Sequence, residues 1–215
     1  SACLVGSEMC IRDSKDMVLC DLDGNKIEAP EGVSQCYEVK MHSCIYRQYP
    51  EVKSVVHVHP RFTILMSLLE KRLRPMRNEG GRLVQKPIPI YPHSKLILTD
   101  EDGSGVAALM TPGTRAVLLK GHGVCTAGQS LEDVVTTAYH LEEQAMLNAW
   151  AWSLAGPDHG YTPDALLDEA AAQPPFWQMP HFKMDAPPAR APRGSGDFRG
   201  HGWWAYQVDA VSKDL

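Results

Sequence analysis

Two histidines separated by one residue, His57 and His59, are the first residues in this sequence that could do chemistry. They lie in the run Ser54–Pro60, which we interpret as a strand. Because successive side chains of a strand alternate between its faces, both imidazoles point the same way and Val58 points the opposite way. Two imidazoles on one rigid face can occupy two positions around a metal ion. Two histidines that bind nothing fit the same spacing, so the rest of the chain must decide.

The composition excludes several classes of partner. The chain has 215 residues, 44% of them hydrophobic and 22% charged, which is ordinary for one sizeable globular domain. A net charge of −5 gives no electrostatic support for binding nucleic acid or an anionic membrane. We find no membrane span and no secretory signal. Six cysteines without a C-x-x-C pair are typical of free thiols in a reducing compartment, so we expect a cytoplasmic protein.

The first residues do not look like natural protein. Residues 4–14 resemble the translation of an adapter DNA used in preparing sequencing libraries. We therefore exclude residues 1–14 from the interpretation of the fold, as an artefactual leader. We expect that the natural chain begins upstream and that this one is N-terminally truncated.

Apolar periodicity and turn residues predict alternating strands and helices. The predicted strands cover residues 17–22, 26–28, 54–60, 87–91 and 116–119. The predicted helices cover residues 37–49, 62–70, 103–109, 130–154 and 163–171. Prolines place the 87–91 strand at a sheet edge, and Ser130 with Asp133 predicts a capped start of the longest helix.

Three of these segments have a more specific interpretation. The Asp21–Asn25 run invites a calcium loop, but Lys26 and Gly32 stand where that loop needs Gly and Glu, so we predict a hairpin. Glu38 and His42 share a face of the 37–49 helix. In the 62–70 helix we expect four apolar residues to point inward: Ile64, Leu65, Leu68 and Leu69.

Together these motifs resemble the class II aldolase/adducin family over residues 15 to about 155. The residues that carry the resemblance are Asp21–Asn25, Glu38 with His42, Tyr49–Val52 ahead of His57 and His59, Gly121-His122-Gly123, and His140 on the long helix. The combination is much more specific than the paired histidines alone.

The resemblance implies a metal site and an activity. It implies a divalent metal, commonly zinc (manganese, iron or cobalt being alternatives), held by His57, His59 and His140 with one position left open for substrate. Glu38 matches the catalytic acid–base of the family, which implies a carbon–carbon lyase. His122 usually belongs to a turn in this family, and we keep it as a rival ligand.

The sequence departs from the sugar-phosphate aldolases beside Glu38. Cys36 and Tyr37 replace the small hydroxyl residues that bind phosphate there. Arginines such as Arg77 suit a carboxylate, although a solvated basic loop explains them equally well. These departures resemble the decarboxylases of aromatic hydroxy-carboxylates, which we favour. Open alternatives are an aldolase acting on a sugar phosphate or another hydroxy-ketone, an isomerase or dehydratase, and a non-catalytic adducin-like binding module. The expected substrate contacts are Tyr37, Arg77, His122 and Tyr91.

The family also implies an architecture. We expect an α/β fold, a three-layer α/β/α sandwich around a central, mainly antiparallel sheet. The domain would span residues 15–160, with residues 161–215 as a C-terminal extension packed on the same domain. A homotetramer with the small-molecule site at a subunit interface is expected. Residues that could reach a neighbouring subunit are Trp203, Trp204, Tyr206 and Tyr91.

Overall fold

A computed structural model describes residues 17–111, 113–174, 179–181, 204 and 208. The proposed leader, most of residues 172–200, Trp203 and Tyr206 lie outside the described residues. The chain divides into two compact units, one up to Tyr161 and one from Thr162 onward. The second unit contains α5 (Asp164–Ala172).

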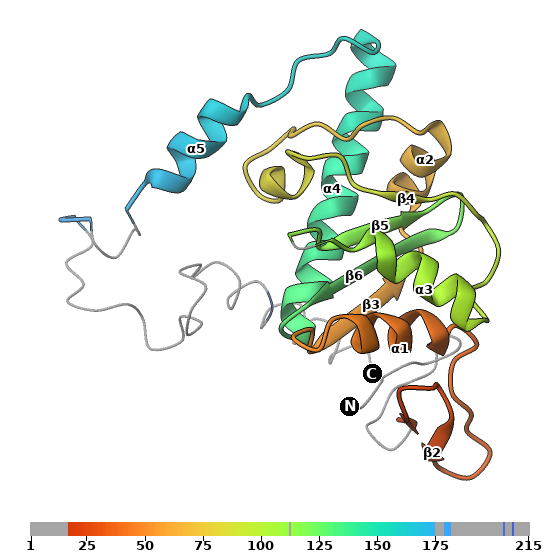
Figure 1. The fold of residues 1–215 in the computed structure, drawn as a ribbon. Helices are drawn as coiled ribbons and strands as arrows, with labels where there is room; N and C mark the ends of the chain where they lie inside the picture. Colours follow the sequence, from red (N-terminus) through yellow and green to blue (C-terminus); the bar gives the residue numbers. More distant parts are fainter. Residues whose placement is uncertain (1–16, 112, 175–178, 182–203, 205–207, 209–215) are drawn as a thin grey trace. The chain divides into compact units, whose positions relative to one another are not determined.

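The centre of the first unit is a four-stranded sheet (Figure 1). Its strands are β3 (Ser54–Val58), β4 (Ile90–Tyr91), β5 (Ala116–Leu119) and β6 (Gly123–Gly128). They lie in the order β3-β6-β5-β4, with antiparallel pairs β3–β6 and β6–β5 and a parallel pair β5–β4. The sheet is therefore mixed and mainly antiparallel, and the predicted edge position of β4 is confirmed.

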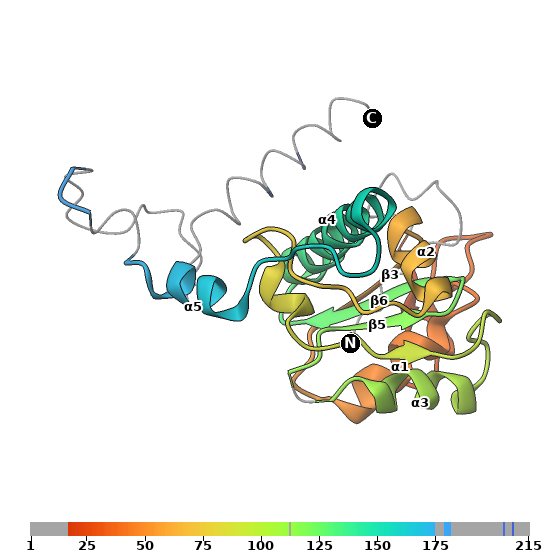
Figure 2. The ribbon, with the colours of Figure 1, turned by 90° about the horizontal axis from the view of Figure 1, so that it is seen from above.

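Helices cover both faces of this sheet (Figure 2). On one face lie α1 (Val39–Gln48) and α3 (Asp100–Leu109), and on the other lie α2 (Arg61–Leu69) and α4 (Leu131–Ala155). Short elements complete the unit: the antiparallel pair β1 (Leu19–Cys20) and β2 (Lys26–Glu28), and the 3-10 turn η2 (Gly81–Val84). The predicted three-layer α/β/α sandwich is confirmed. Among the described residues, no helix combines the length and apolar character needed to span a bilayer.

Side chains that alternate along the strands pack into two separate hydrophobic cores, one on each face of the sheet. Val55 packs in the core beneath α1 and α3, whereas Val58 packs against the core beneath α2 and α4. Since His57 shares the parity of Val55, β3 directs it toward the α1 side of the sheet.

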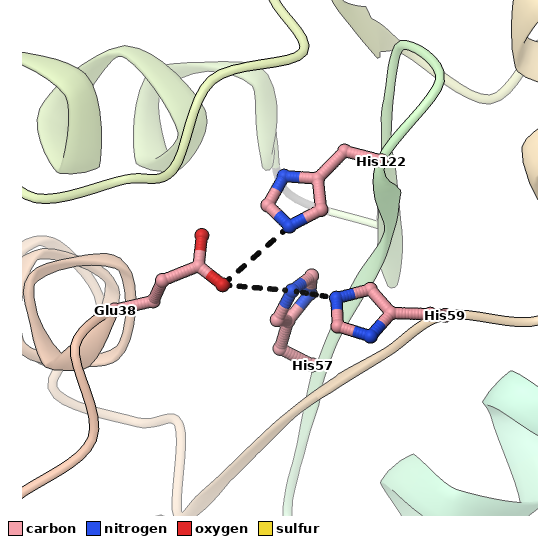
Figure 3. A group of neighbouring side chains, drawn as sticks. All are labelled: Glu38, His57, His59 and His122. Carbon is pink, nitrogen blue, oxygen red and sulfur yellow. Dashed lines mark hydrogen bonds and ion pairs between the residues drawn. The ribbon is translucent and has the colours of Figure 1, made fainter. Parts of the chain in front are cut away.

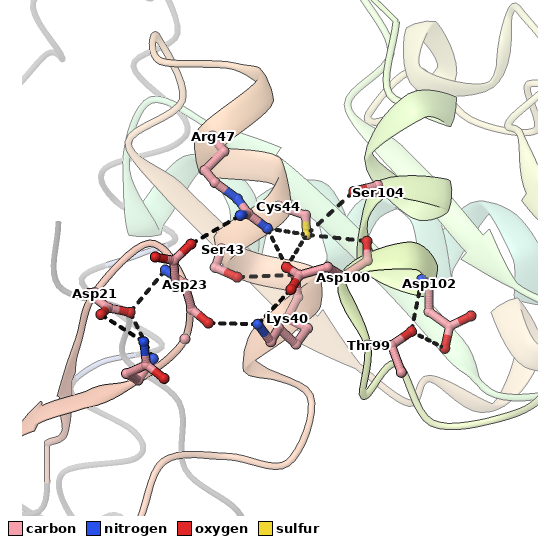
Figure 4. Close-up of polar contacts among 12 residues, drawn as sticks. Asp21, Asp23, Lys40, Ser43, Cys44, Arg47, Thr99, Asp100, Asp102 and Ser104 are labelled. Carbon is pink, nitrogen blue, oxygen red and sulfur yellow. Dashed lines mark hydrogen bonds and ion pairs between the residues drawn. The ribbon is translucent and has the colours of Figure 1, made fainter.

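Local signals set the helix starts and the first hairpin. Ser130 accepts a hydrogen bond from the Asp133 amide at 3.1 Å, as the capping pattern predicts. The Asp21 carboxylate accepts the amides of Asp23 and Asn25 at 2.9 and 2.8 Å, within the hairpin (Figure 4). The Asp21 carboxylate thus stabilises the turn between β1 and β2, and these two strands form the predicted hairpin.

The predicted inward face of α2 was wrong at three of its four residues, and only Ile64 is half-buried. Leu65, Leu68 and Leu69 are 41%, 53% and 47% exposed, and the residues buried instead are Thr63, Met66 and Ser67. The polar residues can turn inward because they have partners. The Glu142 carboxylate accepts both the amide and the hydroxyl of Thr63 at 2.8 Å, and the Ser67 hydroxyl accepts the Gly121 amide at 3.0 Å.

Two buried amide side chains of α4 hold the irregular loop that precedes η2. Gln144 accepts the Met76 amide at 2.8 Å and donates to the carbonyls of Arg77 and Glu79 at 3.0 and 2.8 Å. Asn148 pairs in the same way with both backbone groups of Arg74, at 2.9 and 2.8 Å. The loop therefore obtains from a helix the backbone hydrogen bonds that it lacks from a strand.

We expect Gln144→Leu to destabilise the protein by about 2–5 kcal/mol, because three partly buried backbone groups lose the buried side chain that pairs with them. Urea unfolding followed by circular dichroism measures this. Gln48→Leu, at an exposed position of α1, is the matched control and should cost under about 0.5 kcal/mol. Equal costs for the two variants would contradict the role of Gln144.

Candidate active site

Three histidines and one glutamate meet at one end of the sheet (Figure 3). β3 pairs with β6 so that Val58 lies opposite Val124, which puts His59 beside the turn that joins β5 to β6. His122 lies in that turn. One potential ligand atom from each of Glu38, His57, His59 and His122 lies within 4.8 Å of all the others.

The backbone of β6 sets the tautomer of His57. Nδ1 of His57 lies 3.0 Å from the Val124 carbonyl oxygen, which can only accept, so Nδ1 carries the hydrogen. In the neutral ring, Nε2 then presents its lone pair to the centre of the cluster. Ligating histidines are commonly oriented in this way, through a hydrogen bond from their other nitrogen.

Gly123 provides the space for the two paired imidazoles. A Cβ at this position would stand 2.5 Å from the Val58 carbonyl oxygen, 2.8 Å from His59 Cδ2 and 3.0 Å from His57 Cε1. Gly121, two residues earlier, has a φ of +67°, a conformation that favours glycine. The Gly-His-Gly run therefore makes the tight turn and admits the rings next to it.

The carboxylate of Glu38 is held from two sides. Glu38 directly precedes α1 and is 8% exposed. Its Oε1 accepts the Ile97 amide at 2.9 Å, while Oε2 lies 3.3 Å from His57 Nε2 and 3.5 Å from His122 Nε2. Burial raises the pKa of this carboxyl, but the His57 contact, the Ile97 amide and the neighbouring imidazoles outweigh burial and lower it to about 2. Glu38 is thus a buried anion that faces imidazole nitrogens.

The remaining contacts crowd electron-rich atoms around one point. Nε2 of His59 lies 3.0 Å from Nε2 of His57. Burial lowers the pKa of His59, and the neighbouring imidazoles lower it further. Burial also lowers the pKa of His122, although Glu38 raises it. Imidazoles that stay neutral beside a carboxylate are a suitable donor set for a divalent metal. The residues present therefore fit the metal that the sequence implies.

His122 is held less completely than His57. Its Nδ1 is buried and makes no hydrogen bond of ordinary geometry with the described residues, although the Lys95 backbone lies near enough to favour the protonated ring. His42, one turn beyond Glu38 on α1, is buried, and burial lowers its pKa to about 4. It is therefore a neutral residue beneath the site at physiological pH.

The other predicted site residues lie outside this cluster. His140 is on α4, and the backbone of Gly80 packs against it: a Cβ on Gly80 would stand 2.6 Å from His140 Cβ. Since α4 covers the opposite face of the sheet from α1, the side chain of His140 starts from another layer than Glu38. Its role as a ligand stays a prediction.

Apart from His122, the predicted substrate contacts differ in whether their side chains already have partners and in how exposed they are. Arg77 donates to Glu79 at 3.1 Å and to Glu143 at 2.9 Å. Tyr91 is buried and donates its hydroxyl to Asp102 at 3.1 Å. Tyr37, next to Glu38, is 75% exposed. Their contacts with a substrate stay predictions.

Comparison with known proteins identifies the family. The sequence profile of the Class II Aldolase and Adducin N-terminal domain matches residues 7–149. The chain belongs to the class II aldolase and adducin family. The family that the paired histidines, Glu38 and the Gly-His-Gly turn indicated is therefore confirmed.

Individual relatives within this family carry different names. The chain is 31% identical over 156 residues to a 3,4-dihydroxyphthalate decarboxylase of Arthrobacter keyseri, covering 69% of this chain but 62% of that protein. It is 27% identical to an L-fuculose phosphate aldolase of Methanococcus maripaludis, covering 62% of this chain and 69% of the aldolase. A solved L-fuculose 1-phosphate aldolase matches with a TM-score of 0.64 and 22% identity over 78% of this chain and 76% of its own, which shows the shared fold.

We expect Gly123→Ala to lower the affinity for zinc by about 10–100-fold, because the added methyl group displaces both imidazoles and the Val58 carbonyl. Competition with a chromogenic chelator measures the affinity. Gly160→Ala is the control, since a Cβ there meets nothing within 4 Å. An unchanged zinc affinity in Gly123→Ala would contradict the claim that Gly123 provides the space for the His57 and His59 rings.

Proposed function

We propose that this protein is a metal-dependent carbon–carbon lyase whose metal site is built on His57 and His59. The observation that carries the proposal is the convergence of the Glu38 carboxylate with imidazole nitrogens at one end of the sheet. The names of the relatives support it, since decarboxylases and aldolases are both carbon–carbon lyases. A non-catalytic adducin-like module has no use for such a donor set, so we favour the enzyme.

A divalent metal, with zinc as the first expectation, is the proposed cofactor. His57 and His59 are two ligands, and His140 is the third that the family resemblance implies. The proximity of His122 to Glu38 supports His122 as the alternative third ligand. When bound, the metal supplies Lewis-acid chemistry that polarises a substrate oxygen.

Glu38 is the proposed acid–base group. Its Oε1 accepts the Ile97 amide, whereas Oε2 faces the ring nitrogens of His57 and His122, so Oε2 is the atom that we propose takes up or delivers a proton. Burial keeps bulk water away from this oxygen and fixes its direction. A carboxylate placed in this way would move a proton at a carbon or oxygen of the substrate.

We propose decarboxylation of an aromatic hydroxy-carboxylate as the reaction. It is supported by the 31% identity to the 3,4-dihydroxyphthalate decarboxylase and by Cys36 and Tyr37 ahead of Glu38. The exposed Tyr37 ring offers an aromatic face beside the acid–base group. Cleavage of a sugar phosphate is the second candidate, supported by the L-fuculose phosphate aldolases.

A cytoplasmic homotetramer is the proposed state. Exposed apolar side chains on α2 and α4 support association: Leu65, Leu68, Leu69, Trp150 and Leu154. Apolar surface of this kind favours burial against a partner.

We expect purified protein loaded with zinc to hold about one equivalent, since three ligands with one open position form a catalytic site. Plasma mass spectrometry after gel filtration measures it. His57→Ala should lose the metal. His140→Ala and His122→Ala identify the third ligand. Only the variant that lacks the true ligand should lose zinc affinity, by about 10-fold or more. His93→Ala, at an exposed histidine, is the control. No zinc in a folded wild-type sample would overturn the metal site.

We expect the wild-type protein to release carbon dioxide from 3,4-dihydroxyphthalate or a related hydroxy-carboxylate, and Glu38→Gln to lower kcat by about 10²–10⁴-fold by removing the proton-transfer group. Glu31→Gln, an exposed acid of the preceding loop, is the control. Products are identified by chromatography, with L-fuculose 1-phosphate assayed in parallel. Aldehyde formation with no decarboxylation would favour the aldolase. Turnover of neither substrate class by metal-loaded protein would count against the lyase.

A further inference from the structure

We propose that Asp102 is a positioning residue for Glu38, acting through the segment Tyr91–Thr99. This inference deepens the proposed function and rests on it where activity is concerned, because it identifies what aims the acid–base carboxylate. Among the described residues, the Asp102 carboxylate contacts Tyr91, Lys95 and Thr99 rather than Glu38 or the histidines, so its effect passes through the backbone of the segment that it holds.

The Asp102 carboxylate ties down both ends of this segment. Its Oδ1 accepts the Tyr91 hydroxyl at 3.1 Å and the Lys95 ammonium at 2.7 Å. Its Oδ2 accepts the Thr99 hydroxyl at 2.9 Å, and the Thr99 hydroxyl in turn accepts the Asp102 amide at 3.2 Å. One carboxylate, 8% exposed, therefore closes a loop of nine residues. Charge-assisted hydrogen bonds of this kind are stronger and more directional than neutral ones.

The middle of the closed loop touches the active site. The Ile97 amide is the donor to Glu38 Oε1, and this hydrogen bond is buried. The Ile97 side chain is fully buried, while Leu96 and Leu98 on either side are about half exposed. A shift of the segment by one residue would expose Ile97 and remove the donor, so the position of the loop sets the direction of the carboxylate.

The same helix turn is locked to the element that carries Glu38. A Cβ on Gly103 would stand 2.5 Å from the Lys40 carbonyl oxygen and 2.8 Å from Cys44 Sγ, so α3 lies directly against α1. The Tyr91 ring rests on α3 in a similar way, 3.0 Å from the Cβ position of Gly105. Asp102 thus lies on α3, which packs directly against α1, and it fixes the position of the segment Tyr91–Thr99 relative to both helices.

A neighbouring acid provides the matched comparison. Asp100, in the same first turn of α3, faces α1 and pairs with Lys40 and Arg47 (Figure 4). Its side chain is 55% exposed, and exposed ion pairs contribute little. Asp100 and Asp102 share the helix, the turn and the charge, but only Asp102 holds the segment that reaches Glu38.

The test compares Asp102→Asn with Asp100→Asn in the full chain. Asp102→Asn keeps the size of the side chain but loses the charge that binds Lys95. We expect hydrogen exchange at the Ile97 amide, measured by mass spectrometry with residue-level fragmentation, to become at least about 10-fold faster. We expect kcat to fall about 10-fold or more, with KM and zinc content unchanged, since a misaimed acid–base group affects the chemical step. Asp100→Asn should leave all four quantities at the wild-type level.

Each outcome decides the proposal. Wild-type exchange at Ile97 in a folded Asp102→Asn protein overturns it, as does an equal effect of Asp100→Asn. If Asp102→Asn does not fold, Lys95→Met replaces it, because Lys95 is exposed and contributes one of the ties; faster exchange at Ile97 supports the proposal and unchanged exchange overturns it. If the wild-type protein turns over no substrate, the proposed function fails, but the exchange rate still decides whether Asp102 positions the segment.

Discussion

The pairing of β3 with β6 is the constraint on which this site depends. Its register brings the end of β3, with His57 and His59, against Gly123 and the turn that carries His122. The same register places the Val124 carbonyl where it accepts from His57 and so presents the other ring nitrogen inward. A shift of one residue would turn both paired imidazoles to the opposite face and separate them from Glu38. Backbone hydrogen bonds of the sheet therefore set the side-chain chemistry.

Glu38 needs a different kind of support, because a buried carboxylate is costly unless it is paired and hydrogen-bonded. The Ile97 amide and the imidazoles supply this, and they come from a loop, a strand and a turn that are distant in sequence. The low pKa of Glu38, about 2, follows from these contacts outweighing its burial. A proton or a cation at the centre of the cluster would neutralise the same charge, so the electrostatics of the cluster favour the metal that we propose.

The features predicted well from sequence depend on local chemistry. Ser130 and Asp133, three residues apart, predict the capped start of α4. The prolines beside β4 predict its edge position, because proline has no N–H to donate to a neighbouring strand. The inward face of α2 was predicted wrongly because the partner that satisfies Thr63 is Glu142, about 80 residues away. The proximity of His122 to Glu38 likewise depends on β6 lying between β3 and β5. This strand order cannot be predicted from the spacing of apolar residues along the sequence. Tertiary partners, rather than propensities, decided both cases.

Backbone groups hold Glu38 and His57, whereas the side chain of the neighbouring Tyr37 is exposed. Glu38 and His57 are held by backbone groups of Ile97 and Val124, whose hydrogen bonds do not depend on the side chains at those two positions. Tyr37 is 75% exposed next to this centre, and its side chain is free of such a requirement. Since decarboxylation and aldol cleavage both need a polarised oxygen and a proton-transfer group, one centre serves either reaction. Under the proposed function, substrate choice changes through exposed residues such as Tyr37 without disturbing the sheet, which agrees with decarboxylases and aldolases both being relatives of this chain.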